Sequence, residues 1–235
     1  MTDKSEFYTT RLKTFGRRHG HTLRPHHVEL VENLLPDLRV SPEEIVKNPD
    51  LKALFKRSVD EVWLEIGFGG GEHAAWQVEN HPHIGMIACE PFMNGVATFL
   101  AHVEERNLQD GIRILDEDAR QIIDVLPDQS LDRMFLLFPD PWRKKRHAKR
   151  RFIGDENLEL VARVLKSGGE FRVASDHMPY IEWTLRHLVD HPDFEWICDG
   201  PNDWRVRPDD WAPTRYEQKA LQQGKKCVYL RFKRV

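Results

Sequence analysis

Residues 62–73 read Val62-Trp63-Leu64-Glu65-Ile66-Gly67-Phe68-Gly69-Gly70-Gly71-Glu72-His73: a short apolar run, four glycines within five residues, and a segment compatible with a helix. This order predicts a buried strand that enters a tight turn and opens a helix, with backbone N–H groups facing a nucleotide-like ligand. A dinucleotide fingerprint starting at Gly67 would need glycine at position 72, where the chain has Glu72. Because this carboxylate would repel a pyrophosphate from the helix N-terminus, the stretch disfavours a phosphate ligand.

Glu65 lies at the end of the expected strand, two residues before the first glycine. Its carboxylate accepts hydrogen bonds and carries negative charge, so it suits a cationic ligand with hydroxyl or ammonium donors. The spacing Glu65-x-Gly67-x-Gly69-x-Gly71 resembles the first motif of class I S-adenosylmethionine-dependent methyltransferases. Glu65, Gly67 and Gly69 are therefore candidate cofactor-binding residues.

Strands and helices are expected to alternate from residue 62 onward. The expected strands are 62–67, 84–89, 112–115, 131–137, 170–174, 194–198 and 227–232, and the expected helices are 72–80, 93–107, 119–126, 155–166 and 178–190. This alternation implies right-handed crossovers and an α/β fold, a doubly wound, mostly parallel seven-stranded sheet with helices on both faces. Ligands of such sheets bind at the carboxyl ends of the strands.

The chain has 235 residues, of which 40% are hydrophobic and 31% charged, and this suits a large domain with a small N-terminal extension. We expect residues 1–58 to form a basic arm with a short helix after Ser41, and residues 59–235 to form the ligand-binding domain. No apolar run approaches the ~18 residues of a membrane span, and the N-terminus lacks the apolar segment of a signal peptide. A cytoplasmic protein without membrane contact is expected.

Cysteine and histidine patterns give no indication of a metal site. The three cysteines include no C-x-x-C pair, and the twelve histidines include no H-E-x-x-H motif. Neither a bound metal nor a disulfide framework is expected.

The net charge is −3, but the basic residues are concentrated at residues 143–151. This run contains seven Lys or Arg and no acid, which leaves −10 for the rest of the chain. Such a run on an acidic protein is typical of a localised contact with a polyanion, the alternative being a solvated helix face. A second basic region, residues 11–27, is interleaved with turn-forming residues and is expected to be an irregular arm that contacts RNA, or else a disordered tail.

Acidic residues also follow the second and third expected strands. Glu90 comes 23 residues after Gly67, about where a carboxylate accepts hydrogen bonds from a ribose diol. Asp118 follows the third strand, where it would accept from an adenine amine or cap the next helix, two compatible roles. Both positions predict an adenosine-containing cofactor. Dinucleotide-binding enzymes also bind the ribose with an acidic residue at this place, so Glu90 does not distinguish the two classes of cofactor.

The fourth expected strand ends in Phe138-Pro139-Asp140-Pro141-Trp142, and the basic run follows at once. The two prolines fix φ on either side of Asp140, so this carboxylate is held on a rigid turn at the ligand end of the sheet. A basic segment beside it can hold phosphates while the turn faces a base. This combination indicates chemistry on a nucleic acid.

The segment 138–151, Phe-Pro-Asp-Pro-Trp-Arg-Lys-Lys-Arg-His-Ala-Lys-Arg-Arg, closely resembles the F-P-D-P-W-x-K-x-R-H-x-K-R-R signature of bacterial tRNA (guanine-N7-)-methyltransferases. Every fixed position of that signature is filled. Further matches are the Glu90-Pro91 pair, Ala174-Ser175-Asp176 and Thr214-Arg215-Tyr216-Glu217. The resemblance covers about residues 15–233.

The resemblance implies an enzyme that methylates a guanine in the tRNA variable loop, nucleotide 46 of the tRNA, with S-adenosylmethionine as cofactor and S-adenosylhomocysteine as product. It places Glu65, Glu90, Asp118 and Asp140 around the cofactor. It assigns tRNA contacts to Lys144, Arg146, Lys149, Arg150, Arg151, Asp176, Thr214, Arg215, Tyr216 and Glu217. No obligate protein partner is implied, and the enzyme is expected to be a monomer or a homodimer.

The chemistry itself places few demands on the site. Guanine N7 carries a lone pair and no proton, so its attack on the sulfonium methyl needs no general base. The product ring is cationic, so the site must supply in-line approach and a negative environment. We expect Asp140, the candidate catalytic residue, to hold the guanine or stabilise its charge, a role as base being chemically unnecessary. We expect Asp176 to pair with the guanine N1–H and N2–H donors.

Three alternatives compete with this interpretation. Another RNA nucleobase methyltransferase would usually carry Asn-Pro-Pro-Tyr or Asp-Pro-Pro-Tyr where this chain has Phe138-Pro139-Asp140-Pro141-Trp142. A non-catalytic RNA-binding protein on the same fold is disfavoured by the intact Glu65, Glu90 and Asp140. A nicotinamide oxidoreductase is disfavoured by Glu72 and the basic run. For Thr214 and Glu217, the alternative to substrate contact is a helix capping box.

Overall fold

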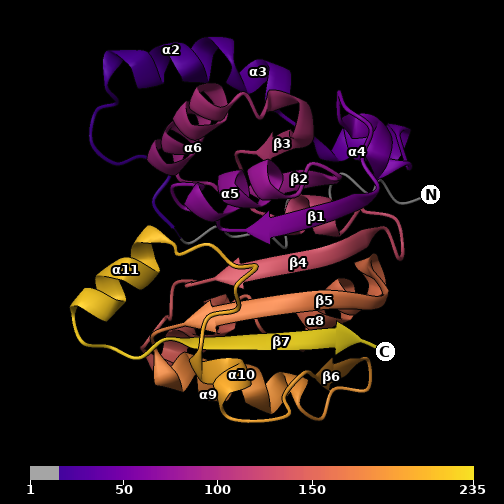
Figure 1. The fold of residues 1–235 in the computed structure, drawn as a ribbon, viewed down its shortest axis with the longest axis vertical. Helices are drawn as coiled ribbons and strands as arrows, with labels where there is room; N and C mark the ends of the chain where they lie inside the picture. Colours follow the sequence, from indigo (N-terminus) through magenta and orange to yellow (C-terminus); the bar gives the residue numbers. More distant parts are fainter. Residues whose placement is uncertain (1–15) are drawn as a thin grey trace.

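The computed structural model describes residues 16–235, and its centre is one seven-stranded sheet (Figure 1). The strands are β1 (Glu61–Ile66), β2 (Ile84–Cys89), β3 (Ile112–Leu115), β4 (Leu131–Leu137), β5 (Leu165–Ser175), β6 (Phe194–Trp196) and β7 (Val228–Arg234). Their order across the sheet is β3-β2-β1-β4-β5-β7-β6. Strands β1 to β5 pair in parallel, whereas β7 is antiparallel to β5 and β6. The expected mostly parallel α/β sheet is confirmed.

Helices cover both faces of the sheet and enclose two apolar cores. The α-helices are α2 (Pro25–Asn33), α3 (Leu35–Leu38), α4 (Pro42–Lys47), α5 (Glu72–Asn80), α6 (Met93–Arg106), α7 (Arg120–Ile123), α8 (Asp155–Val164), α9 (Met178–Leu188), α10 (Asn202–Arg205) and α11 (Arg215–Gln222). Short 3-10 helices are η1 (Leu51–Leu54), η2 (Gln109–Gly111) and η3 (Lys145–Arg150). One core receives residues of α2, α3, α5, α6 and α11, and the other receives residues of α4, α7, α8 and α9. Among residues 16–235, no helix is long and apolar enough to cross a membrane.

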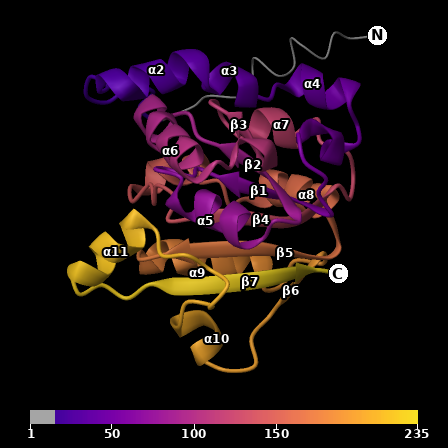
Figure 2. The same cartoon turned by 45° about the horizontal axis from the view of Figure 1, so that its top comes forward.

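The parallel strands bring their carboxyl ends to one edge of the molecule. In Figure 1 the arrowheads of β1, β4 and β5 point to the side on which α11 lies. The turned view in Figure 2 keeps α11 at this edge and shows α2, α3 and α4 at the β3 end of the sheet, opposite α10. Segments that are far apart in the sequence therefore meet at the edge where ligands of this fold bind.

The N-terminal region contains a helix that the sequence patterns do not predict. Residues 16–24 lack regular structure, as expected for the arm, but α2 begins at Pro25 and packs against α6. Leu30 is the one buried residue of α2, so this short helix depends on its packing against α6. Arg11 and Lys13 of the predicted basic arm lie outside the described residues.

The boundary between α8 and β5 also differs from the expectation. Helix α8 ends at Val164, and β5 begins at Leu165 and not at residue 170. Gly168, with φ of 82°, lies in this extension, and the pairing of β5 with β4 shifts register between Leu131 and Arg133. The sequence did not predict this boundary, because an irregular part of a strand carries no alternating pattern of apolar and polar residues.

Candidate active site

Three glycines in left-handed conformation shape the turn after β1. Gly67, Gly69 and Gly71 have φ of 70°, 59° and 77°, values that favour glycine. A β-carbon on Gly71 would lie 2.2 Å from the Phe99 ring, so the turn packs directly on α6. Nothing lies within 4 Å of the place that a β-carbon of Gly67 would take. The turn therefore borders open space at the carboxyl end of β1.

Glu90 follows β2, and its carboxylate is fixed against this glycine turn. It accepts hydrogen bonds from the backbone N–H groups of Gly69 and Phe92, both at 2.9 Å. Burial raises the pKa of Glu90, and the charges of Asp140 and Glu65 add to this rise, while the two N–H donors oppose it. Burial is the largest of these causes, and the smaller contributions of Asp140 and Glu65 place two further carboxylates near Glu90.

Asp140 is exposed on the loop after β4. Phe138 and Trp142 on either side of it have positive φ, 50° and 42°, which is strained for aromatic residues. The Arg151 guanidinium holds the loop by donating to the carbonyls of Pro141, at 3.1 Å, and Trp142, at 3.5 Å. Within residues 16–235 the Asp140 carboxylate makes no hydrogen bond or ion pair. The loop is held while this carboxylate remains available.

Tyr216 extends from α11 to the same turn. A β-carbon on Gly69 would lie 3.0 Å from Tyr216 Cε2. Partial burial and the charges of Glu90, Asp140 and Glu72 raise the pKa of Tyr216. The side chain is nevertheless 59% exposed, so the ring has a free surface beside the turn. The structure thus brings together four of the predicted site residues: Gly69, Glu90, Asp140 and Tyr216.

The cations of the basic run fall into an exposed group and a group that packs against tryptophan rings. Lys144, Arg146 and Lys149 are exposed beside the Asp140 loop, where phosphates could reach them. Arg150 and Arg151 pack against tryptophan rings, each with its guanidinium carbon 4.9 Å from a ring centroid. The structure therefore shows packing contacts for Arg150 and Arg151, and the contact of all five residues with RNA stays a prediction.

The remaining residues of the 214–217 segment have partners within the protein. Thr214 and Glu217 form the capping box of α11, which confirms the alternative that the sequence left open. Glu217 is buried and accepts a hydrogen bond from the Tyr229 hydroxyl at 2.6 Å. Arg215 is exposed and its Nε lies 3.4 Å from Glu72 Oε1. Contact of Thr214, Arg215 and Glu217 with substrate stays a prediction.

Glu65 is buried at the end of β1. Its Oε2 lies 2.7 Å from His73 Nδ1 in α5, and the side chains of both residues are at most 2% exposed. Gln77 Nε2 lies 3.0 Å from His73 Nε2 and donates to the Asp210 carbonyl at 2.8 Å. This buried chain of contacts joins the strand end to the loop before α11. The sequence did not indicate it, although His73 follows the glycine turn directly.

Asp118 and Asp176 each pair with a nearby cation. Asp118 binds the Arg120 guanidinium at 2.6 Å and accepts from the Arg120 backbone N–H at 3.1 Å. Asp176, directly after β5, pairs with Lys225 Nζ at 2.6 Å. Both carboxylates lie at carboxyl ends of strands, as expected, and their contacts with ligands stay predictions.

Comparison with known proteins identifies the family. A family model described as "Putative methyltransferase" matches residues 60–230. A tRNA (guanine-N(7)-)-methyltransferase of Rhodospirillum rubrum is 49% identical over 222 residues, which cover 94% of this chain and 87% of the relative. The relative of the same name from Brucella anthropi is 47% identical over 235 residues, 99% of each chain. This chain belongs to the tRNA (guanine-N(7)-)-methyltransferase family.

Solved structures show that this tRNA (guanine-N(7)-)-methyltransferase family member has the class I, Rossmann-like methyltransferase fold. An antibiotic-related methyltransferase superposes with a TM-score of 0.51 and 13% identity, covering 83% of this chain and 95% of that chain. A SAM-dependent O-methyltransferase from Thermotoga maritima gives a TM-score of 0.50 and 15% identity, with 88% and 71% covered. At these identities the likeness shows the fold alone.

Part of the predicted basic arm of this methyltransferase lies in the site region. The N-terminal segment 18–21 crosses the start of α6, where Gly20 N–H donates to Asn94 Oδ1 at 2.7 Å. Arg18 Nη1 donates to Glu117 Oε2 at 2.8 Å, next to Asp118. These contacts place a basic segment beside the carboxyl ends of β2 and β3.

Proposed function

We propose that this methyltransferase transfers the methyl group of S-adenosylmethionine to N7 of a guanine in the variable loop of tRNA and releases S-adenosylhomocysteine. One observation carries the proposal: Glu90 accepts from the Gly69 N–H and Tyr216 lies against the same glycine, in an open turn at the edge where the Asp140 loop and the exposed cations of the basic run follow β4. The curated relatives that carry the name of this activity match nearly the whole chain.

The residues at the glycine turn fit S-adenosylmethionine. Open space borders Gly67, and the oriented carboxylate of Glu90 suits the two hydroxyls of a ribose. Asp118 at the end of β3 would accept from the adenine amine, while Glu65 lies behind the turn. When bound, the cofactor supplies an electrophilic methyl group on a positively charged sulfur. The carboxylates at this edge match that positive charge.

Asp140 has the position that the chemistry requires. Its loop is held by Arg151 while its carboxylate stays unpaired within the described residues. Guanine N7 has no proton to lose, so the gain comes from orienting the base and from stabilising the positive charge that develops on it. We propose that Asp140 does this, and that Asp176 pairs with the donor edge of the guanine.

The tRNA backbone would be held by the exposed cations next to the Asp140 loop. Lys144, Arg146 and Lys149 project from one short segment, so neighbouring phosphates of a folded RNA can contact them together. Such contacts fix the position of the RNA, whereas the choice of base belongs to the site itself.

Nucleoside analysis tests the proposed function directly. The protein is incubated with radiolabelled S-adenosylmethionine and unmodified tRNA, and the digested RNA is separated into nucleosides. We expect label in 7-methylguanosine alone. Label in a different nucleoside would contradict the N7 assignment, and absence of label despite cofactor binding would point to a different substrate or to a non-catalytic RNA-binding protein.

A further inference from the structure

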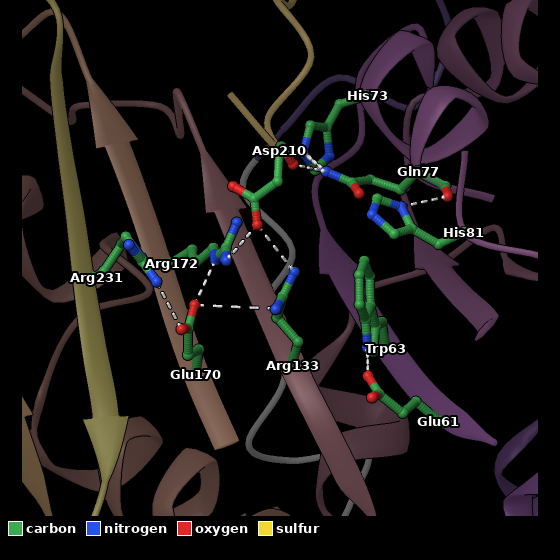
Figure 3. Close-up of polar contacts among 10 residues, drawn as sticks. All are labelled: Glu61, Trp63, His73, Gln77, His81, Arg133, Glu170, Arg172, Asp210 and Arg231. Atoms are coloured by element: carbon green, nitrogen blue, oxygen red, sulfur yellow. Dashed lines mark hydrogen bonds and ion pairs between the residues drawn. The ribbon is translucent and has the colours of Figure 1, made fainter. Parts of the chain in front are cut away.

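A network of three arginines and two carboxylates lies on the sheet face below the loop before α11 (Figure 3). Glu170 accepts from Arg172 Nε at 2.6 Å and from Arg231 Nη2 at 2.8 Å. Asp210 accepts from Arg172 Nη2 at 2.8 Å, and Arg133 Nη1 lies 3.5 Å away. Four of the five residues come from β4, β5 and β7, whereas Asp210 comes from the loop 206–213.

The loop residue Asp210 supplies one of the two negative charges that face three guanidinium groups in this network. Arg172 is only 1% exposed, so its guanidinium depends on nearby carboxylates. Without Asp210, Glu170 would be the one carboxylate left in a network with three guanidinium groups. A buried cation that loses a partner is strongly unfavourable, which makes the loop position energetically specific.

A hydrogen bond to its backbone also holds Asp210 in place. Its carbonyl accepts from Gln77 Nε2 of α5 at 2.8 Å. The next residue, Trp211, is 1% exposed, and its ring lies 5.6 Å from the Tyr229 ring. Three residues separate Asp210 from Thr214, the N-cap of α11. Fixing Asp210 therefore fixes the start of the helix that carries Tyr216.

We propose that Arg172 and Asp210 are positioning residues that fasten the loop 206–213 to the sheet and thereby hold Tyr216 over the glycine turn. The inference rests on the proposed function, because it assigns to α11 a task at the methyl-transfer site. Neither Arg172 nor Asp210 is among the residues at the glycine turn, and we assign their effect to the position of Tyr216.

Hydrogen exchange tests the structural step without reference to activity. In the full-length protein, Asp210→Asn keeps the size of the side chain and removes its charge. Backbone amides of residues 217–222 should then exchange about tenfold faster, because α11 loses a fixed start. The matched control is Asp209→Asn, which removes the same charge from an exposed neighbouring residue. Unchanged exchange in α11 would overturn the inference whether or not the protein methylates tRNA.

A double-mutant cycle tests the functional step. Asp210→Asn and Tyr216→Ala should each lower kcat/KM for tRNA methylation by roughly 10-fold, and the double variant should lose no more than Tyr216→Ala alone. A purely structural role of Asp210 predicts multiplied losses, and such a result would overturn the inference.

A second variant covers the case in which Asp210→Asn fails to fold. Gln77→Leu removes the hydrogen bond to the Asp210 carbonyl without a charge change. Because it also removes the contact with His73, this variant is judged by exchange in α11 and not by activity. If the wild-type protein methylates no tRNA, the proposed function is wrong. The positioning role is then tested in both variants by hydrogen exchange of the α11 backbone amides alone. Faster exchange in either would support the positioning role, and normal exchange in every variant that folds would overturn it.

Discussion

At the residue scale, Asp140 is the side chain whose surroundings leave it available for chemistry. Its flanking residues Phe138 and Trp142 are strained, and Arg151 holds the loop through backbone carbonyls. Strain at a position that the surrounding contacts fix is a common feature of functional sites. The strain here orients a carboxylate that forms no internal ion pair among residues 16–235.

The substitution Asp140→Asn keeps the shape of this side chain and removes its charge. We expect kcat for tRNA methylation to fall about 100-fold, because a fixed charge near the developing guanine cation is lost. Affinity for S-adenosylhomocysteine, measured by calorimetry, should change only a few-fold. A small effect on kcat with intact cofactor binding would contradict a charge-stabilising role.

Gly71 is a residue whose lack of a side chain the backbone conformation requires. Gly71→Ala would combine a strained φ of 77° with a β-carbon 2.2 Å from the Phe99 ring. We expect it to lower the free energy of unfolding by about 3 kcal/mol or more, measured by urea denaturation. Gly168→Ala is the matched control, because Gly168 has φ of 82° and open space around it, and should cost only about 1 kcal/mol. Equal losses would show that the contact with α6 is unimportant.

At the scale of elements, the basic run combines outward cations with cations that hold the loop. Lys149→Ala should lower the slope of log K against log salt for tRNA binding by about one, because one phosphate contact is removed. Arg151→Ala should chiefly lower the melting temperature, since Arg151 holds the carbonyls of Pro141 and Trp142. Lys47→Ala, an exposed lysine on α4, serves as the control and should leave the slope unchanged. A slope near zero for the wild-type protein would contradict phosphate binding by the run.

At the scale of the whole molecule, the arginine and carboxylate network links β4, β5 and β7 to the loop before α11. Burial alone raises the pKa of Glu170 and of Asp210, but the hydrogen bonds and charges of their arginine partners outweigh it, so both pKa values lie below the ordinary 4.5 and 3.8. A carboxyl group whose pKa is lowered by folding stabilises the protein fully above its ordinary pKa. This stability is lost as pH falls through the folded-state value.

Urea unfolding at pH 7, 4 and 3 measures this dependence. We expect the free energy of unfolding to fall steeply below about pH 4, where these carboxyl groups begin to take up protons in the unfolded chain. Asp210→Asn should be less stable at pH 7 and should lose less stability on acidification than the wild type. If both proteins show the same change between pH 4 and pH 3, Asp210 does not contribute to it.

Local patterns in the sequence predict the seven strands, the glycine turn and the acidic residues at strand ends. These features depend on periods and spacings that span only a few residues. The structure places Glu90 and Asp140 at the expected edge, because parallel strands bring their carboxyl ends together. The family signature at residues 138–151 likewise depends on local spacing alone.

Contacts between side chains that are far apart in the chain became visible only in the folded structure. Tyr216 lies over Gly69, and Asp210 meets Arg172, through contacts that span 147 and 38 residues of sequence. Arg151 likewise holds the Asp140 loop, a role that its place in the basic run does not distinguish from RNA binding. The physical reason is that burial and ion pairing depend on which elements pack together, and a local pattern in the chain does not contain that information.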